Sequence, residues 1–217
     1  MIIKVKNYLK RFKSENFLIH SDIFHGFQSS TLSSRKDILD FNLNCLKKIA
    51  SSKNLIFPSF NYNFLKTGKY SMSDDISQVG VLSEYFSRKI SLYRSNEPVF
   101  NFSSLNKLNY FRNDNVIDPF DENSFFDFML NSNTVLIHYG SKFSTTTFLH
   151  YIERSLGKVP YRYDKIFYGK TYLNNRISNK VALKYHVRPM NCYLDYRFNE
   201  IESELINNGL MKKFCDN

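Results

Sequence analysis

The sequence predicts an α/β fold in which a central mixed β-sheet is flanked by helices and followed by an antiparallel C-terminal portion. A short apolar run at residues 17–20 precedes a helical pattern and a second apolar run at residues 54–60, and this alternation is typical of a βαβ unit. A β-branched run at residues 134–139 predicts a buried central strand and leads through a turn at Gly140 into another helical pattern. Residues 165–172 and 180–187 are aromatic and β-branched with partial alternation, which predicts antiparallel strands.

Helices are expected where apolar residues recur three or four positions apart. One follows the N-cap residues within 31–34, and its apolar side consists of Ile38, Leu39, Leu43, Leu46 and Ile49. Others are predicted after Gly80, at residues 122–130 and at residues 198–209, where Gly209 provides the C-terminal stop.

The segments between these elements are less regular. Residues 62–75 are polar and predict a loop, whereas residues 99–102 form a further strand candidate. Residues 106–121 are also polar, with turn signals at Asp118 and Pro119.

Length and composition limit the class of protein. A chain of 217 residues can bury one substantial core, so residues 1–217 are expected to form a single domain. A hydrophobic content of 42%, with 21 Phe and 15 Tyr, excludes a disordered chain. No apolar run approaches the roughly 20 residues of a membrane span. Three scattered cysteines predict neither a disulfide framework nor a metal site, so a cytoplasmic location is expected.

The first thirteen residues, MIIKVKNYLKRFK, lack the apolar region and cleavage site of a secretory signal. They are compatible with a helix packed on the domain or with a basic amphipathic helix on a membrane surface.

The net charge of +10 favours anionic partners. Lys and Arg are spread along the chain, and no zinc-finger, helix-turn-helix or RRM pattern is present. A phosphorylated cofactor or substrate is therefore expected, and nucleic acid is not. A nucleic-acid-binding protein remains an alternative that a continuous basic face would identify.

The best candidate for a reactive site is the segment 133–162. Its helix carries His150 and Glu153, which the spacing of three residues places on one face close to the end of the strand. Any of four hydroxyl residues could cap this helix: Ser144, Thr145, Thr146 and Thr147. The free N–H groups of such a turn can hold an anion. Two structural alternatives remain: a core histidine satisfied by a backbone carbonyl, and a surface carboxylate at Glu153 paired with Arg154 or Lys158.

Several segments occur in the order known from one enzyme family. These are LIHSDI, LIFPSF, VGVLSEYFSRK with YRSNEP, and TTTFLHYIE with VPYRY. Together they cover most of the chain, which resembles the aminoglycoside 3-N-acetyltransferases, also called antibiotic N-acetyltransferases. The resemblance implies an antibiotic N-acetyltransferase-like fold and the direct transfer of an acetyl group from acetyl-coenzyme A to a primary amine on a sugar.

The resemblance also assigns catalytic roles. His150 matches the catalytic histidine of the family, and Glu153 matches the carboxylate that follows it. An attacking amine must lose a proton, and a neutral imidazole is a suitable base near neutral pH. Glu153 would orient the ring and stabilise the imidazolium.

Binding residues are likewise implied by the resemblance, although each could instead be a capping, turn or exposed residue. The residues expected to bind the cofactor are His20, Ser21, Arg94, Ser95, Ser144 and Thr145. Glu84 and Glu97 are expected to bind the substrate, with helix solvation and a solvated loop as their alternatives. Glu97 departs from the family, which commonly has a histidine at this position. His25, His138 and His186 are expected to be exposed or structural.

The expected acceptor is an amino sugar, in particular one that is linked to a nucleotide and used for surface polysaccharide. The chain is short and lacks long acidic loops, and its positive charge disfavours a polycationic substrate. Antibiotic resistance and a catalytically silent binding relative are the alternatives. A homo-oligomer is possible.

Overall fold

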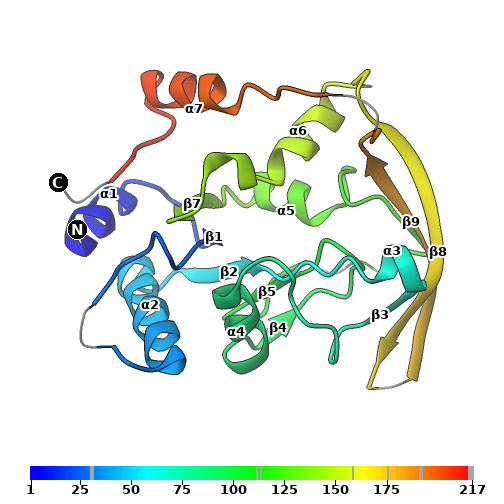
Figure 1. The fold of residues 1–217 in the computed structure, drawn as a ribbon, viewed down its shortest axis with the longest axis horizontal. Helices are drawn as coiled ribbons and strands as arrows, with labels where there is room; N and C mark the ends of the chain where they lie inside the picture. The colour runs from blue at the N-terminus through cyan, green and yellow to red at the C-terminus, as the bar shows by residue number, and fades with distance from the viewer. Residues whose placement is uncertain are drawn as a thin grey trace.

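The computed structural model describes residues 1–29, 32–110, 112, 114–157, 159–174, 176–190 and 193–214. In this part of the chain the strands form a five-stranded sheet of order β4-β5-β2-β1-β7 and a four-stranded sheet of order β3-β8-β9-β6 (Figure 1). Helices pack beside both sheets, so the predicted α/β class is confirmed. No helix among the described residues is long and apolar enough to cross a membrane.

The parallel part of the five-stranded sheet contains β1 (Asn16–Ser21), β2 (Asn54–Pro58) and β7 (Val135–Tyr139). The helix α2 (Arg35–Ala50) connects β1 to β2, which confirms the predicted βαβ unit. It begins where the Ser34 hydroxyl accepts the backbone N–H of Asp37 at 3.1 Å. Thr31, another predicted cap, lies outside the described residues.

The prediction that β7 is a central, buried strand is wrong. It lies at the edge of the sheet beside β1, and four of its five residues are only half-buried. An apolar β-branched run indicates that a strand has covered faces, but it does not report whether both edges are paired.

Alternate residues of β1 and β2 face two different cores. Phe17 and Ile19 point to the side covered by α1 (Ile2–Leu9), α2 and α4 (Val81–Lys89). The N-terminal segment is thus a helix packed against α2, as one of the two expectations had it. Leu18 points to the opposite side, toward the second sheet and α5 (Phe125–Asn131).

The second sheet is dominated by a long antiparallel hairpin of β8 (Tyr163–Leu173) and β9 (Arg176–Val187), seen at the right of Figure 1. This confirms the predicted antiparallel C-terminal portion. Two short strands pair in parallel at its edges, β3 (Lys69–Ser71) with β8 and β6 (Val116–Ile117) with β9.

Two local predictions are corrected. The segment 62–75 is more regular than a loop, because it contains β3 and the short helix α3 (Phe64–Thr67). The strand expected at residues 99–102 is displaced to β5 (Phe102–Ser104), which pairs with β2 and with β4 (Tyr93–Arg94). Val99 has a positive φ of 69° after Pro98 and therefore cannot continue a strand.

The remaining elements follow β7 and β9. A 3₁₀ turn, η1 (Phe143–Thr145), leads into α6 (Phe148–Ser155). The last helix, α7 (Phe198–Asn207), lies along the top of Figure 1 and contacts η1. It stops before Gly209, whose φ is +70°, as predicted. The chain then returns to α1, where the ring centroids of Tyr8 and Phe214 are 5.4 Å apart.

Gly140 fixes the path from β7 into the turn before α6. Its φ is +72°, and an added Cβ would lie 2.7 Å from the His25 carbonyl carbon and overlap the backbone of Asp22. Both requirements suit glycine alone.

We expect Gly140→Ala to lower the free energy of unfolding by about 2–4 kcal/mol, because it combines left-handed strain with a backbone clash. Gly209→Ala is the matched control, since Gly209 has a φ of +70° but no atom within 4 Å of the added Cβ. It should cost only about 1 kcal/mol. Equal losses for the two variants in urea denaturation would show that the clash is absent.

Glu97 lies in the core and not in a solvated loop. Only 4% of its surface is exposed. The Tyr110 hydroxyl donates to Oε1 at 2.5 Å, and Oε2 has no partner in the described residues. Burial raises the pKa of Glu97 to about 7, against the opposing effects of the Tyr110 hydrogen bond and the Arg112 charge. A carboxyl group that binds its proton more tightly in the folded state makes folding less favourable as the pH rises.

The wild-type free energy of unfolding should therefore fall between about pH 4.3, the ordinary pKa of Glu, and the folded pKa of about 7. Glu97→Gln removes this fall and keeps an acceptor for Tyr110. We expect it to match the wild type near pH 4 and to exceed it by about 1–3 kcal/mol at pH 8. If the free energies of unfolding of the wild type and Glu97→Gln differed by the same amount at every pH, the raised pKa of this buried carboxyl group would be contradicted.

Candidate functional site

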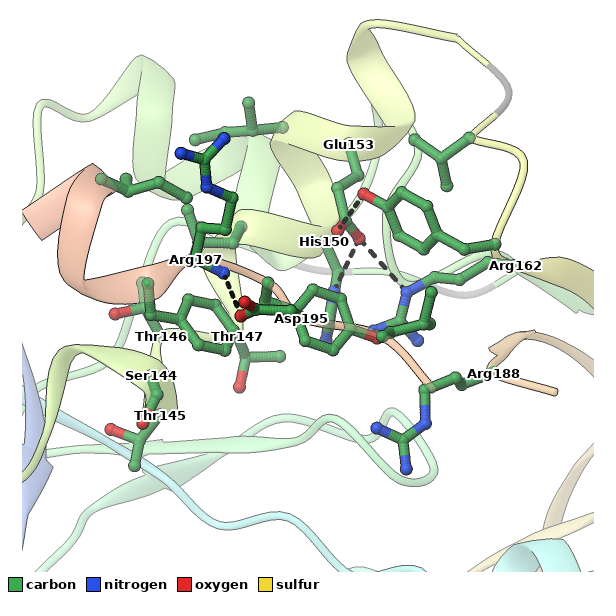
Figure 2. A pocket seen from close by; sticks show the side chains of 18 of the residues that line it. Ser144, Thr145, Thr146, Thr147, His150, Glu153, Arg162, Arg188, Asp195 and Arg197 are labelled. Atoms are coloured by element: carbon green, nitrogen blue, oxygen red, sulfur yellow. Dashed lines mark hydrogen bonds and ion pairs between the residues drawn. The ribbon is translucent and has the colours of Figure 1, made fainter. Parts of the chain in front are cut away.

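A cavity of about 780 Å³ lies between α6, η1, α7 and the segment that follows β9 (Figure 2). Apolar side chains of α6 and α7, such as Leu149, Ile152 and Ile201, form part of its wall. His150 and Glu153 line it together with Ser144 and Thr145. Four of the ten residues expected in the site from sequence therefore meet at one cavity.

The hydroxyl residues before α6 do not cap it as predicted. Thr147 occupies the N-cap position without a side-chain cap hydrogen bond. Thr145 donates to the carbonyl of Lys142 at 2.8 Å, and Thr146 donates to the carbonyl of Phe143 at 2.6 Å. The hydroxyls stabilise the preceding 3₁₀ turn instead, because their side chains fold back on its carbonyls.

His150 and Glu153 form a direct pair. His150 Nδ1 is 2.9 Å from Glu153 Oε2, as the spacing of three residues on α6 predicts. The side chain of Glu153 is 16% exposed and that of His150 is 28% exposed. The ring of Phe120 packs edge-on against the imidazole at 5.7 Å. The pair is thus shielded on one side and open to the cavity on the other.

Two residues just before β8 complete the surroundings of Glu153. The Tyr161 hydroxyl donates to Oε1 at 2.8 Å. Arg162 Nε forms an ion pair with Oε2 at 3.3 Å, without the alignment of a hydrogen bond. Burial alone would raise the pKa of Glu153, but the hydrogen bonds from His150 and Tyr161 and the nearby positive charge outweigh it, so the pKa is lowered. Glu153 is therefore a carboxylate near neutral pH.

The ionised state of Glu153 determines the tautomer of His150. A carboxylate can only accept hydrogen bonds, so Nδ1 of His150 carries the proton that lies between them. In the neutral ring Nε2 then has a free lone pair. This is the arrangement required of a general base.

A group of charges anchors α6 to the second sheet. Arg154, the neighbour of Glu153, forms ion pairs with Asp118 and with Asp164 of β8. Lys184 of β9 pairs with the same two carboxylates. Burial works against ionisation of Asp164, but Arg154 and His186 outweigh it and lower its pKa to about 2. The alternative in which Glu153 pairs with Arg154 is wrong, and Lys158 lies outside the described residues.

His20 and Ser21, at the end of β1, do not line the cavity. The register pairs His20 with His138 across β1 and β7, and their rings stack at 5.2 Å. Burial, followed by the neighbouring His138, lowers the pKa of His20 to about 3, so His20 is uncharged. His138 Nε2 is 3.0 Å from Thr146 Oγ1, which links this pair of histidines to residues 144–147, the hydroxyl residues before α6. His138 is half-buried and hydrogen-bonded, as a packing residue would be.

Four other expected site residues do not reach the cavity. Arg94 uses its guanidinium inside the fold, where it donates to Asn101 and to the carbonyls of Met72, Asp75 and Ser59. Ser95 is buried and its hydroxyl accepts the N–H of Phe102. Glu84 accepts the N–H of Ser77 and pairs with Arg88, and Glu97 lies in the core. These positions give no support to cofactor or substrate contacts.

Sequence reasoning missed Tyr161, Arg162, Arg188 and Tyr196, all of which line the cavity. Arg162 donates to the Tyr196 hydroxyl at 3.1 Å, so the segment after β9 is tied to the entry of β8. The motif VPYRY contains Tyr161 and Arg162, and a phenol and a cation directly before a strand were the available signal. Their contact with Glu153 depends on the docking of the second sheet. Among the described residues no group of His, Cys, Asp and Glu could hold a metal ion.

Solved structures with the same fold are distant in sequence. AAC-IIIb in a binary complex with CoASH matches with a TM-score of 0.72 and 14% identity, over 96% of this chain and 85% of the other. YokD from Bacillus subtilis gives 0.66 and 13%, over 95% and 88%. A variant of AAC(3)-IVa in complex with apramycin gives 0.62 and 16%, over 95% and 79%. No curated protein sequence matches significantly.

The family comparison is more specific. The model of the aminoglycoside 3-N-acetyltransferase family matches residues 54–214, which is most of the chain. This region includes β2, η1, α6 and both strands of the long hairpin. It confirms the predicted enzyme class, an N-acetyltransferase whose family uses acetyl-coenzyme A. The chain therefore belongs to the aminoglycoside 3-N-acetyltransferase family.

Proposed function

We propose that the chain transfers an acetyl group from acetyl-coenzyme A to a primary amine of an amino sugar, with His150 as general base. One observation carries this proposal. His150 lines a cavity with its Nδ1 bonded to the carboxylate of Glu153, which leaves Nε2 for the substrate amine.

The chemistry follows from this pair. The amine nitrogen attacks the thioester carbon, and His150 Nε2 takes a proton from the nitrogen as the C–N bond forms. The C–S bond then breaks, and the imidazolium returns the proton to the departing thiolate of coenzyme A. Glu153 stabilises the transient positive charge, as the acidic member of a triad does. Tyr161 and Arg162 keep its carboxylate ionised and oriented.

The cosubstrate also fits this part of the fold. AAC-IIIb, which has the same fold, is described as a binary complex with CoASH. Coenzyme A carries phosphates and a polar arm that need hydroxyl, N–H and basic groups. Ser144 and Thr145 line the cavity, and His20 is linked to Thr146 of its wall through His138. Ser144, Thr145, His20 and the adjacent Ser21 remain our candidates for coenzyme contacts.

We further propose an anionic acceptor, such as a nucleotide-linked amino sugar for surface polysaccharide. The net charge is +10, and the arginines that line the cavity outnumber the carboxylates there, three to two in the described residues: Arg162, Arg188 and Arg197 against Glu153 and Asp195. A polycationic acceptor would be repelled by such a surface. An aminoglycoside is the second candidate, favoured by the apramycin complex of a related structure.

The acceptor class can be tested by offering acetyl-coenzyme A with a panel of neutral amino sugars, sugar phosphates, nucleotide-linked amino sugars and aminoglycosides, while following thiol release. We expect the highest kcat/KM with an acceptor that carries phosphate. The highest kcat/KM with an aminoglycoside would favour the second candidate. If none of the acceptors gave thiol release, the enzyme proposal would be contradicted.

His150→Ala should lower kcat by on the order of 10² to 10⁴ on the best acceptor, because the amine loses its proton acceptor. The KM of acetyl-coenzyme A should change little. His25→Ala is the matched control, since His25 is exposed and its ring pairs with Asp22 on the surface. Circular dichroism should show the same fold for both variants. An unchanged kcat in a folded His150→Ala protein would remove His150 from the mechanism.

A further inference from the structure

The three arginines that line the cavity differ in what they contact. Arg197 Nε lies 2.6 Å from Glu200 Oε1, so its charge is balanced within α7. Arg162 pairs with Glu153 and donates to the carbonyl of His186 and to Tyr196. Arg188 makes no ion pair and no side-chain hydrogen bond with any described residue. It is the arginine of the cavity whose charge the described protein leaves unbalanced.

Arg188 is placed by the long hairpin. It directly follows β9, and the register Tyr163 with Val187 puts Arg162 and Arg188 at adjacent positions where the hairpin ends. Figure 2 shows Arg188 across the cavity from Ser144 and Thr145, on the same side as Arg162. Two arginines therefore lie at adjacent positions at the end of the hairpin, and Glu153 pairs with Arg162 but not with Arg188.

Like charges at adjacent strand positions are unfavourable. Glu153 offsets the charge of Arg162, and no carboxylate among the described residues pairs with Arg188. Asp195 also lines the cavity, but it accepts the backbone N–H of Arg197 at 3.0 Å and forms no ion pair with Arg188. A guanidinium offers two parallel N–H donors that match the oxygens of a phosphate or a carboxylate. The unpaired guanidinium of Arg188 thus suits an anionic group of a bound molecule.

We infer that Arg188 is a specificity residue, which binds a phosphate or carboxylate group of the acceptor sugar while the amine of that sugar lies beside His150. This inference rests on the proposed acetyl transfer. The hydroxyl residues across the cavity are the candidates for coenzyme contacts, so Arg188 faces the half of the site that remains for the acceptor. The coenzyme phosphates have the same chemistry, and the experiment separates the two sources. Arg188 acts on binding, and the proton transfer to His150 does not pass through it.

The test compares steady-state kinetics of the wild type with Arg188→Gln and Arg188→Lys. The acceptors are glucosamine 1-phosphate, glucosamine 6-phosphate and methyl glucosaminide, which carries no charge besides its amine. Arg188→Gln should raise the KM of the best sugar phosphate about 10- to 100-fold and leave the KM of the neutral sugar, the KM of acetyl-coenzyme A and kcat within about twofold. Arg188→Lys should recover part of the loss, since it restores the charge without the paired donors. Arg176→Gln, at the opposite end of β9, is the matched control and should match the wild type.

Calorimetric binding of the same sugar phosphates, without acetyl-coenzyme A, gives a readout that does not depend on turnover. A loss of affinity in Arg188→Gln supports the inference even where no acceptor is acetylated, in which case only the proposed function fails. An equal rise of KM for neutral and anionic sugars in Arg188→Gln would overturn the inference about Arg188. So would a rise confined to acetyl-coenzyme A, which would assign Arg188 to the coenzyme, and so would the absence of sugar-phosphate binding to the wild type.

Discussion

The carboxylate of Glu153 is the interaction on which the candidate site depends. It is held by a histidine of its own helix and by a phenol and a guanidinium from the entry of β8. Each of these three contacts favours the ionised form, and together they overcome the cost of burying the charge. Ionisation in turn makes Glu153 a pure acceptor, which fixes the proton of His150 on Nδ1. One half-buried charge thereby sets the chemistry of the neighbouring imidazole.

The two sheets contribute different parts of this arrangement. The five-stranded sheet delivers η1 and α6 from the end of β7, where Gly140 makes a turn that a residue with a Cβ would strain. The hairpin of β8 and β9 delivers Tyr161, Arg162 and Arg188 from its open end. Arg154 ties the two parts together through Asp118 and Asp164. The position of His150 relative to the cavity therefore depends on the docking of the second sheet against α6.

Sequence patterns predict the parts of the structure that depend on residues close together in the chain. The alternation of apolar runs gave the βαβ unit, and a spacing of three residues was sufficient to pair His150 with Glu153. The edge position of β7 could not be predicted, because strand pairing depends on residues far apart in the chain. The same holds for Arg94, whose four acceptors come from three distant segments, and for Tyr161 and Arg162, which reach Glu153 only after the sheets pack. Glu97 was misjudged because a charged residue is rarely buried, and its burial here goes with a strongly raised pKa.

The claim that Glu153 fixes His150 as a base can be tested by nitrogen NMR of histidine-labelled protein at pH 8, with His150→Gln used to assign the signals. The account predicts that the neutral form of the ring carries its proton on Nδ1, with the shift of an unprotonated nitrogen at Nε2, and that this tautomer ratio changes in Glu153→Gln. A ring protonated on Nε2 in the wild type, or a spectrum that Glu153→Gln leaves unchanged, would contradict it.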